Sequence, residues 1–495
     1  MVTHCDCLGG HIVRRHRLLW KLVLTACASL GIPTVAQGAA YWILEQGNAS
    51  YGRAGANIAG SDDGSTLYLN PAWLAEFRGF EFVIGANAIK DYRSFERADL
   101  VAPEEQEGLY IPDLSYERAD NLADYPRLSP NFFLTYGLEL APGHALGFGV
   151  GVWGPPRADL EYDPEGAQRY GLVNSYNIQA HPAVGAAYGH QNSGLYIGAH
   201  FAAVTQIVDT TLKLFSAPNP LVCADYEDPG CDLEAHVYTR QDYIPVWSIG
   251  LGWVSEFGLR LGLSYQTGFD VEATGEATFT LGPDLEDKAQ IVGNDVAVDF
   301  DMPWVLRAAL RYAPENANWD IELAYTREQW SVQQTIDFDA SGVSVDVNDN
   351  FNSLGVEDIE SVGLIQLKPS WRDSESLRLG GAASWLGGSL ITRSGVYYES
   401  GAQKRKMMDI GTFDPPKIGF TAGIRYTPAE TLNWLGGGHV YVDVSAGYVE
   451  WIRTEVVSSE AQLNNPTSDE ETYAIGNGVY DSKQIITMMA LGIRL

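Results

Sequence analysis

The feature that most constrains the fold is a two-residue alternation of apolar residues with small or polar ones. In residues 145–153 four large apolar side chains alternate with three glycines, and residues 247–253 and 259–266 follow the same period. Successive side chains of a β-strand point to opposite faces, so this period predicts strands with one apolar face. Beyond the N-terminal region no run of 18 apolar residues occurs, so the sequence offers no transmembrane helix there.

A soluble β-sandwich also alternates, but three features favour a barrel that crosses a membrane. Many expected strands reach ten residues or more, as a tilted span requires. Their second face carries Gly, Ser, Arg, Gln and Asp, which suits a polar lumen better than a packed core. Aromatic residues near the strand ends fit girdles at the two membrane interfaces: Tyr136, Trp153, Trp253, Tyr265, Tyr312, Trp319, Tyr426 and Trp451.

The spacing of the strands supports the same fold. Tight turns are expected at 141–144 and 314–318, and long polar loops at 90–129, 281–295, 337–360 and 458–480. The first strand is expected at 80–89 and the last at 484–495. We predict an all-β fold, a transmembrane antiparallel β-barrel of about 14 strands, because closure leaves no unpaired edge in lipid.

The charge of the chain excludes one class of partner. Its 63 acidic and 32 basic residues give a formal net charge of -31, whereas binding to nucleic acid needs a basic face. We therefore expect no nucleic-acid partner. Two readings of the acidity remain open, namely a solvated acidic surface and acidic loops that face a surface rich in divalent cations.

The N-terminus predicts export. Arg14, Arg15 and Arg17 precede an apolar stretch at 18–35, and small residues follow at 36–40. This order is typical of a secretory signal peptide, here residues 1–38, with cleavage after Gly38 or Ala40. A lipoprotein box ending at Cys27 is the alternative, although the apolar run before that cysteine is very short.

Two cysteines remain in the exported chain, Cys223 and Cys231. An oxidising compartment makes a disulfide between them the expected state, and two unpaired thiols are the alternative. The sequence has no Cys/His cluster with zinc spacing, so we predict neither a metal site nor a cofactor. It also lacks a Gly-x-Ser-x-Gly motif, a phosphate loop and an HExxH motif, so we predict that the protein is not an enzyme.

Residues 39–79 are rich in glycine and other small residues and lack clean alternation, so they form either a plug inside the barrel or a periplasmic tail. Asn70 can cap a helix that begins at Pro71, with Trp73, Leu74 and Phe77 as its apolar face. The motif residues of this segment are Gly52, Arg53, Asp62, Asp63, Asn70, Pro71 and Ala72. Their order and spacing resemble the start of the mature FadL family of outer-membrane long-chain fatty acid and hydrocarbon transporters.

The resemblance implies a domain plan and a function. Residues 39–79 would form an N-terminal hatch and 80–495 the barrel, located in the outer membrane of a Gram-negative bacterium. The ligand would be captured outside, bound in a hydrophobic pocket near the hatch and released laterally through a kinked third strand. The chain would thus take up long-chain fatty acids or similar hydrocarbons by ligand-gated passive diffusion, as a monomer in contact with outer-membrane lipid.

The expected kink coincides with Gly154, Pro155 and Pro156, since proline cannot donate to a β-ladder. An ordinary strand end is the alternative there. The last strand departs from an assembly signal of the usual kind, because it ends in Leu495 rather than Phe.

The sequence leaves the substrate undecided and one alternative function open. Parity places five arginines in the lumen, and each is expected to form a structural charge pair: Arg53, Arg260, Arg307, Arg378 and Arg425. None of them can be matched to a fatty-acid carboxylate from the sequence. The alternative function is an outer-membrane porin or an adhesin-type barrel without specificity for hydrophobic ligands.

Overall fold

A computed structural model describes residues 46–60, 62–100, 114–124, 126–155, 158–214, 227–348, 360–361, 363–367, 369–428, 437–461 and 474–495. The predicted signal peptide, Cys27 and residues 39–45 lie outside the described residues. Among the described helices, none is long and apolar enough to cross a membrane.

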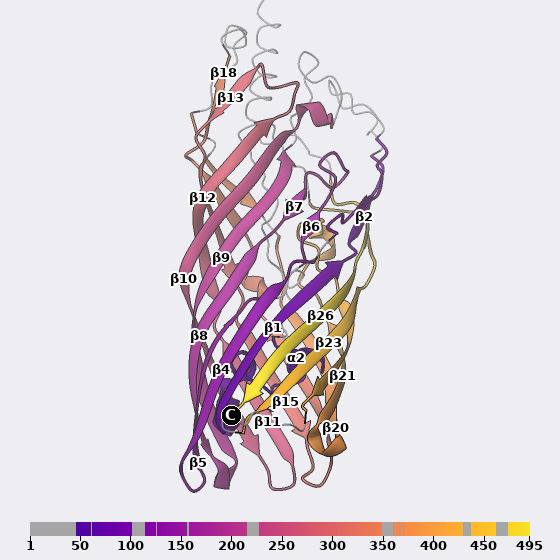
Figure 1. The fold of residues 1–495 in the computed structure, drawn as a ribbon. Helices are drawn as coiled ribbons and strands as arrows, with labels where there is room; N and C mark the ends of the chain where they lie inside the picture. The colour runs from indigo at the N-terminus through magenta and orange to yellow at the C-terminus, as the bar shows by residue number, and fades with distance from the viewer. Residues whose placement is uncertain are drawn as a thin grey trace, which may run out of the picture.

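The described strands close into an antiparallel barrel of fourteen strand paths, which confirms the predicted fold (Figure 1). In chain order the paths are β1 (Gly79–Asp91), β4 (Ser129–Ala141), β5 (His144–Trp153), β8 (Ile178–His190), β9 (Leu195–Leu214), β10 (Leu233–Val254), β11 and β12 (Leu259–Gln266, Phe269–Leu281), β14 and β15 (Asp295–Met302, Val305–Tyr312), β16 and β17 (Trp319–Glu328, Ile336–Ala340), β19 and β20 (Gly363–Leu367, Ser374–Trp385), β21 (Leu390–Glu399), β22 (Lys417–Tyr426), β23 (His439–Trp451) and β26 (Lys483–Arg494).

Closure joins the first and last paths. β1 pairs with β26 from Glu81↔Arg494 to Asp91↔Gln484, and its other edge pairs with β4. Each neighbouring pair is antiparallel, so the backbone groups bond across the sheet wherever the strands are paired, as lipid requires. The first and last strands each begin one residue before the predicted positions.

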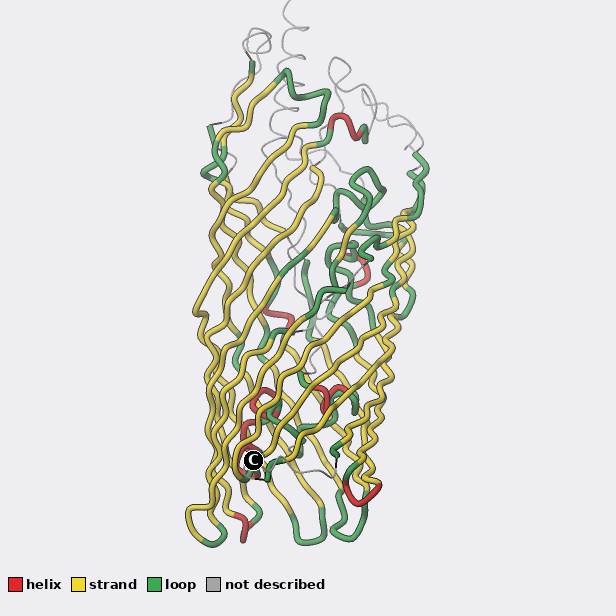
Figure 2. The backbone as a smooth tube through the Cα atoms, viewed as in Figure 1, coloured by secondary structure: helices red, strands yellow, loops and turns green. Residues whose placement is uncertain are grey.

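Short turns lie at one end of the barrel, beside the C-terminus, and the longer connections lie at the other end (Figures 1 and 2). The longer connections contain β2 (Ser94–Arg97), β3 (Ala119–Asp120), β6 (Leu160–Glu161), β7 (Asn174–Ser175), β13 (Ala289–Val292), β18 (Ser344–Val347), β24 (Thr454–Val456), β25 (Gly478–Asp481), η4 (Pro229–Cys231) and η7 (Arg405–Met407). Three further short helices connect strands of the wall: η3 (Gln191–Ser193), η5 (Trp330–Val332) and η6 (Leu386–Gly388).

One predicted loop is wrong in its first residues. Residues 337–340 belong to β17, which pairs with β14 and β19. Phe338 and Ala340 of this strand are buried, and Asp337 and Asp339 alternate with them. The polar residues of this segment led to the prediction of a loop, although the segment keeps the two-residue period of a strand.

The outside of the turn-proximal half of the wall is apolar. Along β10 the exposed residues there are Trp247, Ile249 and Leu251, while Ser248 and Gly250 face inward. Neighbouring strands continue this belt with exposed Leu261, Leu263, Leu310, Ile321, Leu323, Leu377 and Leu379. Such an area of exposed apolar side chains is stable only against hydrocarbon, so this half is the membrane-spanning half.

The prediction of a membrane girdle is wrong for two of its aromatic residues. Trp153 and Trp451 are buried inside the barrel, whereas Tyr265, Tyr312 and Trp319 are exposed on its outside. Trp153 shares its strand parity with the inward-facing glycines of β5 rather than with the outward-facing Phe148. The face to which each aromatic side chain points therefore follows from its parity along the strand and not from its position near a strand end.

The other half of the wall has the opposite pattern, with apolar residues inside and polar residues outside. On β12, Phe269, Val271 and Ala273 are buried, and Asp270 and Glu272 between them are exposed. Acidic residues outside are compatible with water or polar head groups and not with hydrocarbon. This half therefore projects beyond the membrane and carries an apolar interior.

Strand breaks separate the two halves at one level of the wall. β11 ends at Gln266 and β12 begins at Phe269, opposite the gap between β14 and β15 at Pro303 and Trp304. Pro303 has no N–H to donate, so a ladder hydrogen bond is absent there. The next two paths break beside it, between β16 and β17 and between β19 and β20.

The N-terminal segment lies inside the membrane-spanning half. It consists of α2 (Asn48–Tyr51), α3 (Thr66–Leu69) and η2 (Pro71–Glu76), and every residue of α2 and α3 is buried. Figures 1 and 2 place these short helices within the wall, near the end that carries the short turns. The segment passes into β1 at Gly79, one residue before the predicted boundary.

Candidate functional site

Inward-facing glycines of the wall make room for the backbone of the N-terminal segment. A β-carbon on Gly147 of β5 would lie 1.9 Å from the carbonyl oxygen of Leu74. A β-carbon on Gly250 of β10 would lie 2.0 Å from Oδ1 of Asn70. The glycine face that the sequence assigned to a lumen is thus the surface against which the N-terminal segment packs.

Asn70 ties η2 both to its own segment and to the wall. Its Oδ1 accepts a hydrogen bond from the Ala72 backbone N–H at 3.2 Å, and Pro71 occupies the first helical position. Its amide donates to the carbonyl oxygens of Ile58 at 2.9 Å and Leu251 at 3.1 Å. The predicted helix start is confirmed as a 3₁₀ helix, and Asn70 also anchors it to β10.

The predicted Arg53, Asp62 and Asp63 meet charged residues of the wall. Asp62 lies 3.3 Å from Arg53, 3.5 Å from Arg311 and 3.7 Å from Arg393. We call the following set the buried charge cluster: Arg53, Asp62 and Asp63 of the segment with Arg311, Asp320, Glu322, Arg393, Arg425 and Asp443 of the wall. Gly52 lies beside this cluster, packed against Gly423 of β22.

The cluster brings four arginines together with five carboxylates inside the membrane-spanning half. Arg425 lies 3.3 Å from Asp63 and 2.7 Å from Asp443, and Arg393 lies 3.1 Å from Asp443. Arg53, Arg311 and Arg393 approach Asp62, and Arg425 approaches Asp63, so ion pairs hold the N-terminal segment to the wall.

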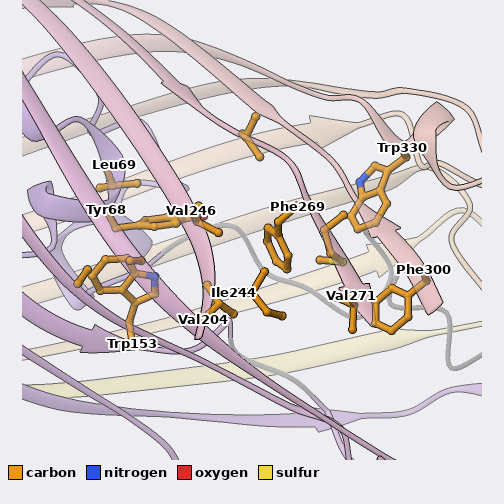
Figure 3. Packing of buried hydrophobic residues seen from close by; sticks show 14 of the residues in the cluster. Tyr68, Leu69, Trp153, Val204, Ile244, Val246, Phe269, Val271, Phe300 and Trp330 are labelled. Carbon is orange, nitrogen blue, oxygen red and sulfur yellow. The ribbon is translucent and has the colours of Figure 1, made fainter. Parts of the chain in front are cut away.

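An apolar interior leads from the N-terminal segment into the projecting half. Figure 3 shows Tyr68 and Trp153 at one end of a series of buried side chains that continues through Val246 and Phe269 to Trp330. Val204, Ile244, Val271 and Phe300 belong to the same cluster. The aliphatic and phenylalanine side chains of this interior make no demand for hydrogen bonds, as contact with a hydrocarbon chain requires.

The wall is interrupted beside the N-terminal segment. β5 ends at Trp153, which pairs with His181, and Gly154 and Pro155 lie outside any strand. Pro156 lies outside the described residues. Among the described pairings, β5 meets β4 as far as Phe132↔Val152 and β8 as far as Trp153↔His181, so neither neighbour pairs with β5 beyond these residues.

Trp153 lies at this interruption and is 1 % exposed. Its ring lies 5.6 Å from that of Tyr68 in the N-terminal segment, and 5.8 Å from each of Phe133, His181 and His200. A single buried indole therefore connects the segment to the strand that ends early.

The predicted lumen arginines have different partners. Arg260 bonds Glu76 of η2 at 2.6 Å, and Arg378 bonds Glu399 at 3.0 Å. Arg307 differs, because its guanidinium lies over the Tyr68 ring at 4.6 Å and no described carboxylate bonds it. The prediction of a structural charge pair is wrong for Arg307.

Cys231 is disulfide-bonded, and Cys223 lies outside the described residues, so their pairing stays a prediction. Cys231 also approaches Asp228 and Asp284 in a group with the spacing of a metal site. A disulfide sulfur is a poor metal ligand, so this group does not form a convincing site.

Sequence reasoning missed the wall residues that bond the N-terminal segment. Arg311, Asp320, Arg393 and Asp443 lie on membrane-spanning strands, with their charges directed inward. Charged residues on the small-residue face of an otherwise apolar strand were the available signal. Tyr68 gave no signal, because it lies in a segment without periodicity.

Known proteins resemble this chain in sequence pattern and in fold. A model of the family described as outer membrane protein transport protein (OMPP1/FadL/TodX) matches residues 29–473. A Pseudomonas aeruginosa FadL homologue has a TM-score of 0.67 at 13% identity, covering 92% of this chain and 98% of that chain. No curated protein matches the chain in sequence.

Two toluene transporters have similar folds. TbuX of Ralstonia pickettii has a TM-score of 0.58 at 16% identity, covering 91% of this chain and 98% of that chain. TodX of Pseudomonas putida has a TM-score of 0.59 at 14% identity, with coverages of 91% and 98%. At these identities the solved structures support the fold alone.

Proposed function

Because this chain belongs to the OMPP1/FadL/TodX family of outer membrane transport proteins, we propose that it takes up long-chain fatty acids and similar hydrophobic molecules by ligand-gated passive diffusion. It is an outer-membrane β-barrel of a transport family rather than of an enzyme family.

The reversed alternation of the projecting half carries the proposal. A water-filled pore needs polar residues inside, whereas β12 and β14 direct Val271, Val298 and Phe300 inward and their acidic residues outward. Burying each methylene of a ligand in such an interior contributes about 0.8 kcal/mol. This gain can draw an acyl chain out of water without any input of metabolic energy.

The N-terminal segment serves as the gate in this proposal. Asn70, Asp62 and Asp63 hold it to the wall by hydrogen bonds and ion pairs that a local movement can break and remake. The interruption after Trp153 gives a lateral exit toward the membrane, since no ladder hydrogen bond of β5 needs to be broken beyond that residue. Gly154 and Pro155 lie at this exit.

Ion conductance and uptake together test the proposal. In planar bilayers the intact protein should pass no large steady ion current, because the N-terminal segment fills the membrane-spanning half. In proteoliposomes it should mediate saturable entry of labelled palmitate without ATP or an ion gradient. Protein-free membranes of the same lipid are the control. Large steady currents without palmitate entry would reject the proposal and favour the water-filled porin.

A further inference from the structure

Two histidines face each other on the outside of the wall, at the end that carries the short turns. His144 begins β5 and His190 ends β8, and the two residues are directly opposite in the ladder between these strands (Figure 1). Each shares its parity with an exposed aromatic residue of its own strand, Phe148 or Tyr188. Both side chains are half-buried, so neighbours restrict the rings while water still reaches them. Spacing in the sequence does not reveal this pair, because a ladder between distant strands brings it together.

The distance between the two rings is that of imidazoles that share one metal ion. The ring centroids of His144 and His190 lie 4.8 Å apart, and the ring planes are inclined by 45°. A zinc–imidazole bond is about 2.0–2.1 Å long, so two rings bound to one tetrahedral ion have centroids roughly 5 Å apart. The observed separation is therefore compatible with one ion bound by both rings.

Each ring has one nitrogen in a hydrogen bond and one nitrogen available. Nδ1 of His190 lies 2.7 Å from Oγ of Ser193, and the Ser193 hydroxyl donates to the His190 carbonyl oxygen at 3.1 Å. That oxygen is left to accept from Nδ1–H, which places the lone pair of the neutral ring on Nε2. Nδ1 of His144 lies 2.6 Å from the Tyr188 hydroxyl, and neither Nε2 atom has a hydrogen-bond partner among the described residues. Histidines that bind metal ions are oriented in this way, by a hydrogen bond from the other ring nitrogen.

The ligand atoms select the class of ion. Neutral imidazole suits Zn²⁺, Cu²⁺ and Ni²⁺, whereas Ca²⁺ and Mg²⁺ prefer oxygen ligands. Among the described residues no third histidine, cysteine or carboxylate joins the pair, so water would complete the coordination of a bound ion. Of the divalent first-row ions, Cu²⁺ generally binds nitrogen ligands most tightly.

An ion at this position would join two strands that border the interruption of the wall. β5 pairs with β8 from His144↔His190 to Trp153↔His181, where β5 ends. A cross-link at the first pair of this ladder fixes the register of all the pairs that follow. It also stabilises the folded barrel, because the ion binds only where folding has brought the two rings together.

We propose that His144 and His190 form a binding site for one divalent transition-metal ion, Cu²⁺ or Zn²⁺, which cross-links β5 to β8 at the short-turn end of the barrel. The two Nε2 atoms are the ligands. Tyr188 and Ser193 are positioning residues that hold the rings through Nδ1. The site lies on the outside of the wall and does not depend on the proposed function.

Copper binding to the untagged protein, purified from outer membranes and placed in lipid nanodiscs, tests this proposal. Wild type should bind one Cu²⁺ per barrel, with an electron paramagnetic resonance spectrum that shows coupling to two imidazole nitrogens. Excess Zn²⁺ should displace the copper, whereas the same excess of Mg²⁺ should not. His144→Gln and His190→Gln should each weaken copper binding by about tenfold or more and lose the two-nitrogen pattern.

The matched control is His236→Gln, which makes the same substitution at an exposed histidine that lies 3.0 Å from Asp209 on the outside of β10. His236→Gln should keep the copper affinity and the spectrum of wild type. A wild type that binds no more copper than empty nanodiscs, or whose spectrum lacks coupling to two nitrogens, would overturn the proposal even if no variant folds. Unchanged copper affinity in a folded His144→Gln would overturn it as well.

Discussion

Deletion of residues 42–76 behind an intact signal should leave a folded barrel in the outer membrane that leaks. The wall closes through β1, β4 and β26 without the N-terminal segment, so the deletion removes no strand. The emptied membrane-spanning half is lined by glycines and charged residues, and water will fill it. We expect single-channel conductance to rise by about tenfold or more over the intact protein, as an unplugged polar lumen implies.

Selective uptake should disappear in the same variant. Without Tyr68 and the buried charges of the segment, a palmitate molecule no longer meets a closed gate, and small polar solutes pass equally well. Heat-modifiable mobility on gels shows whether the barrel has folded. The control is Asp242→Asn, which removes an exposed ion pair outside the lumen and should change neither conductance nor uptake. If the folded deletion variant conducts no more ions than the intact protein and transports palmitate normally, the segment is not a gate.

Val271→Asp should abolish palmitate uptake while the barrel still assembles. Val271 is fully buried in the apolar interior of the projecting half, on a strand outside the apolar belt. A carboxylate there retains water and interrupts the apolar surface along which the chain moves. We expect the uptake rate to fall by about tenfold or more, since an unsatisfied buried polar group alone costs roughly 1–3 kcal/mol.

Thr274→Asp is the matched control for this variant. It introduces the same carboxylate on the same strand, but Thr274 is exposed on the outside of the barrel. Uptake by Thr274→Asp should equal that of wild type. Normal uptake by a folded Val271→Asp would show that the cargo does not pass through the projecting half.

The fold could be predicted from the sequence because the two faces of each strand meet different environments, lipid or water outside and the interior of the barrel inside. The period of residues 247–253 and 259–266 predicts which side chains face lipid, and these are the exposed Trp247, Leu251 and Leu263. Asn70 and Pro71 likewise predict the start of η2 through local hydrogen bonding alone. Local rules of this kind need no knowledge of distant residues.

The site could be predicted from the sequence only in part, because its contacts join residues far apart in the chain. Asp62 could be singled out by its motif, but its partners Arg311 and Arg393 lie on strands that only closure brings to the same level. Arg307 bonds no carboxylate among the described residues, although the neighbouring β16 carries the buried Glu322 and Glu328, whose oxygens accept hydrogen bonds from Ile58 and Trp330. No spacing in the sequence encodes such an absence.

The interior route is tested most directly by photolabelling. A long-chain fatty acid that carries a diazirine on its chain is cross-linked to the protein in outer membranes, and the labelled residues are identified by peptide sequencing. Labels are expected on the inward-facing Val246, Val271 and Phe300, and an excess of unlabelled acid should remove them. Labels confined to the outward-facing Leu251 and Leu263, unaffected by that excess, would contradict passage through the barrel.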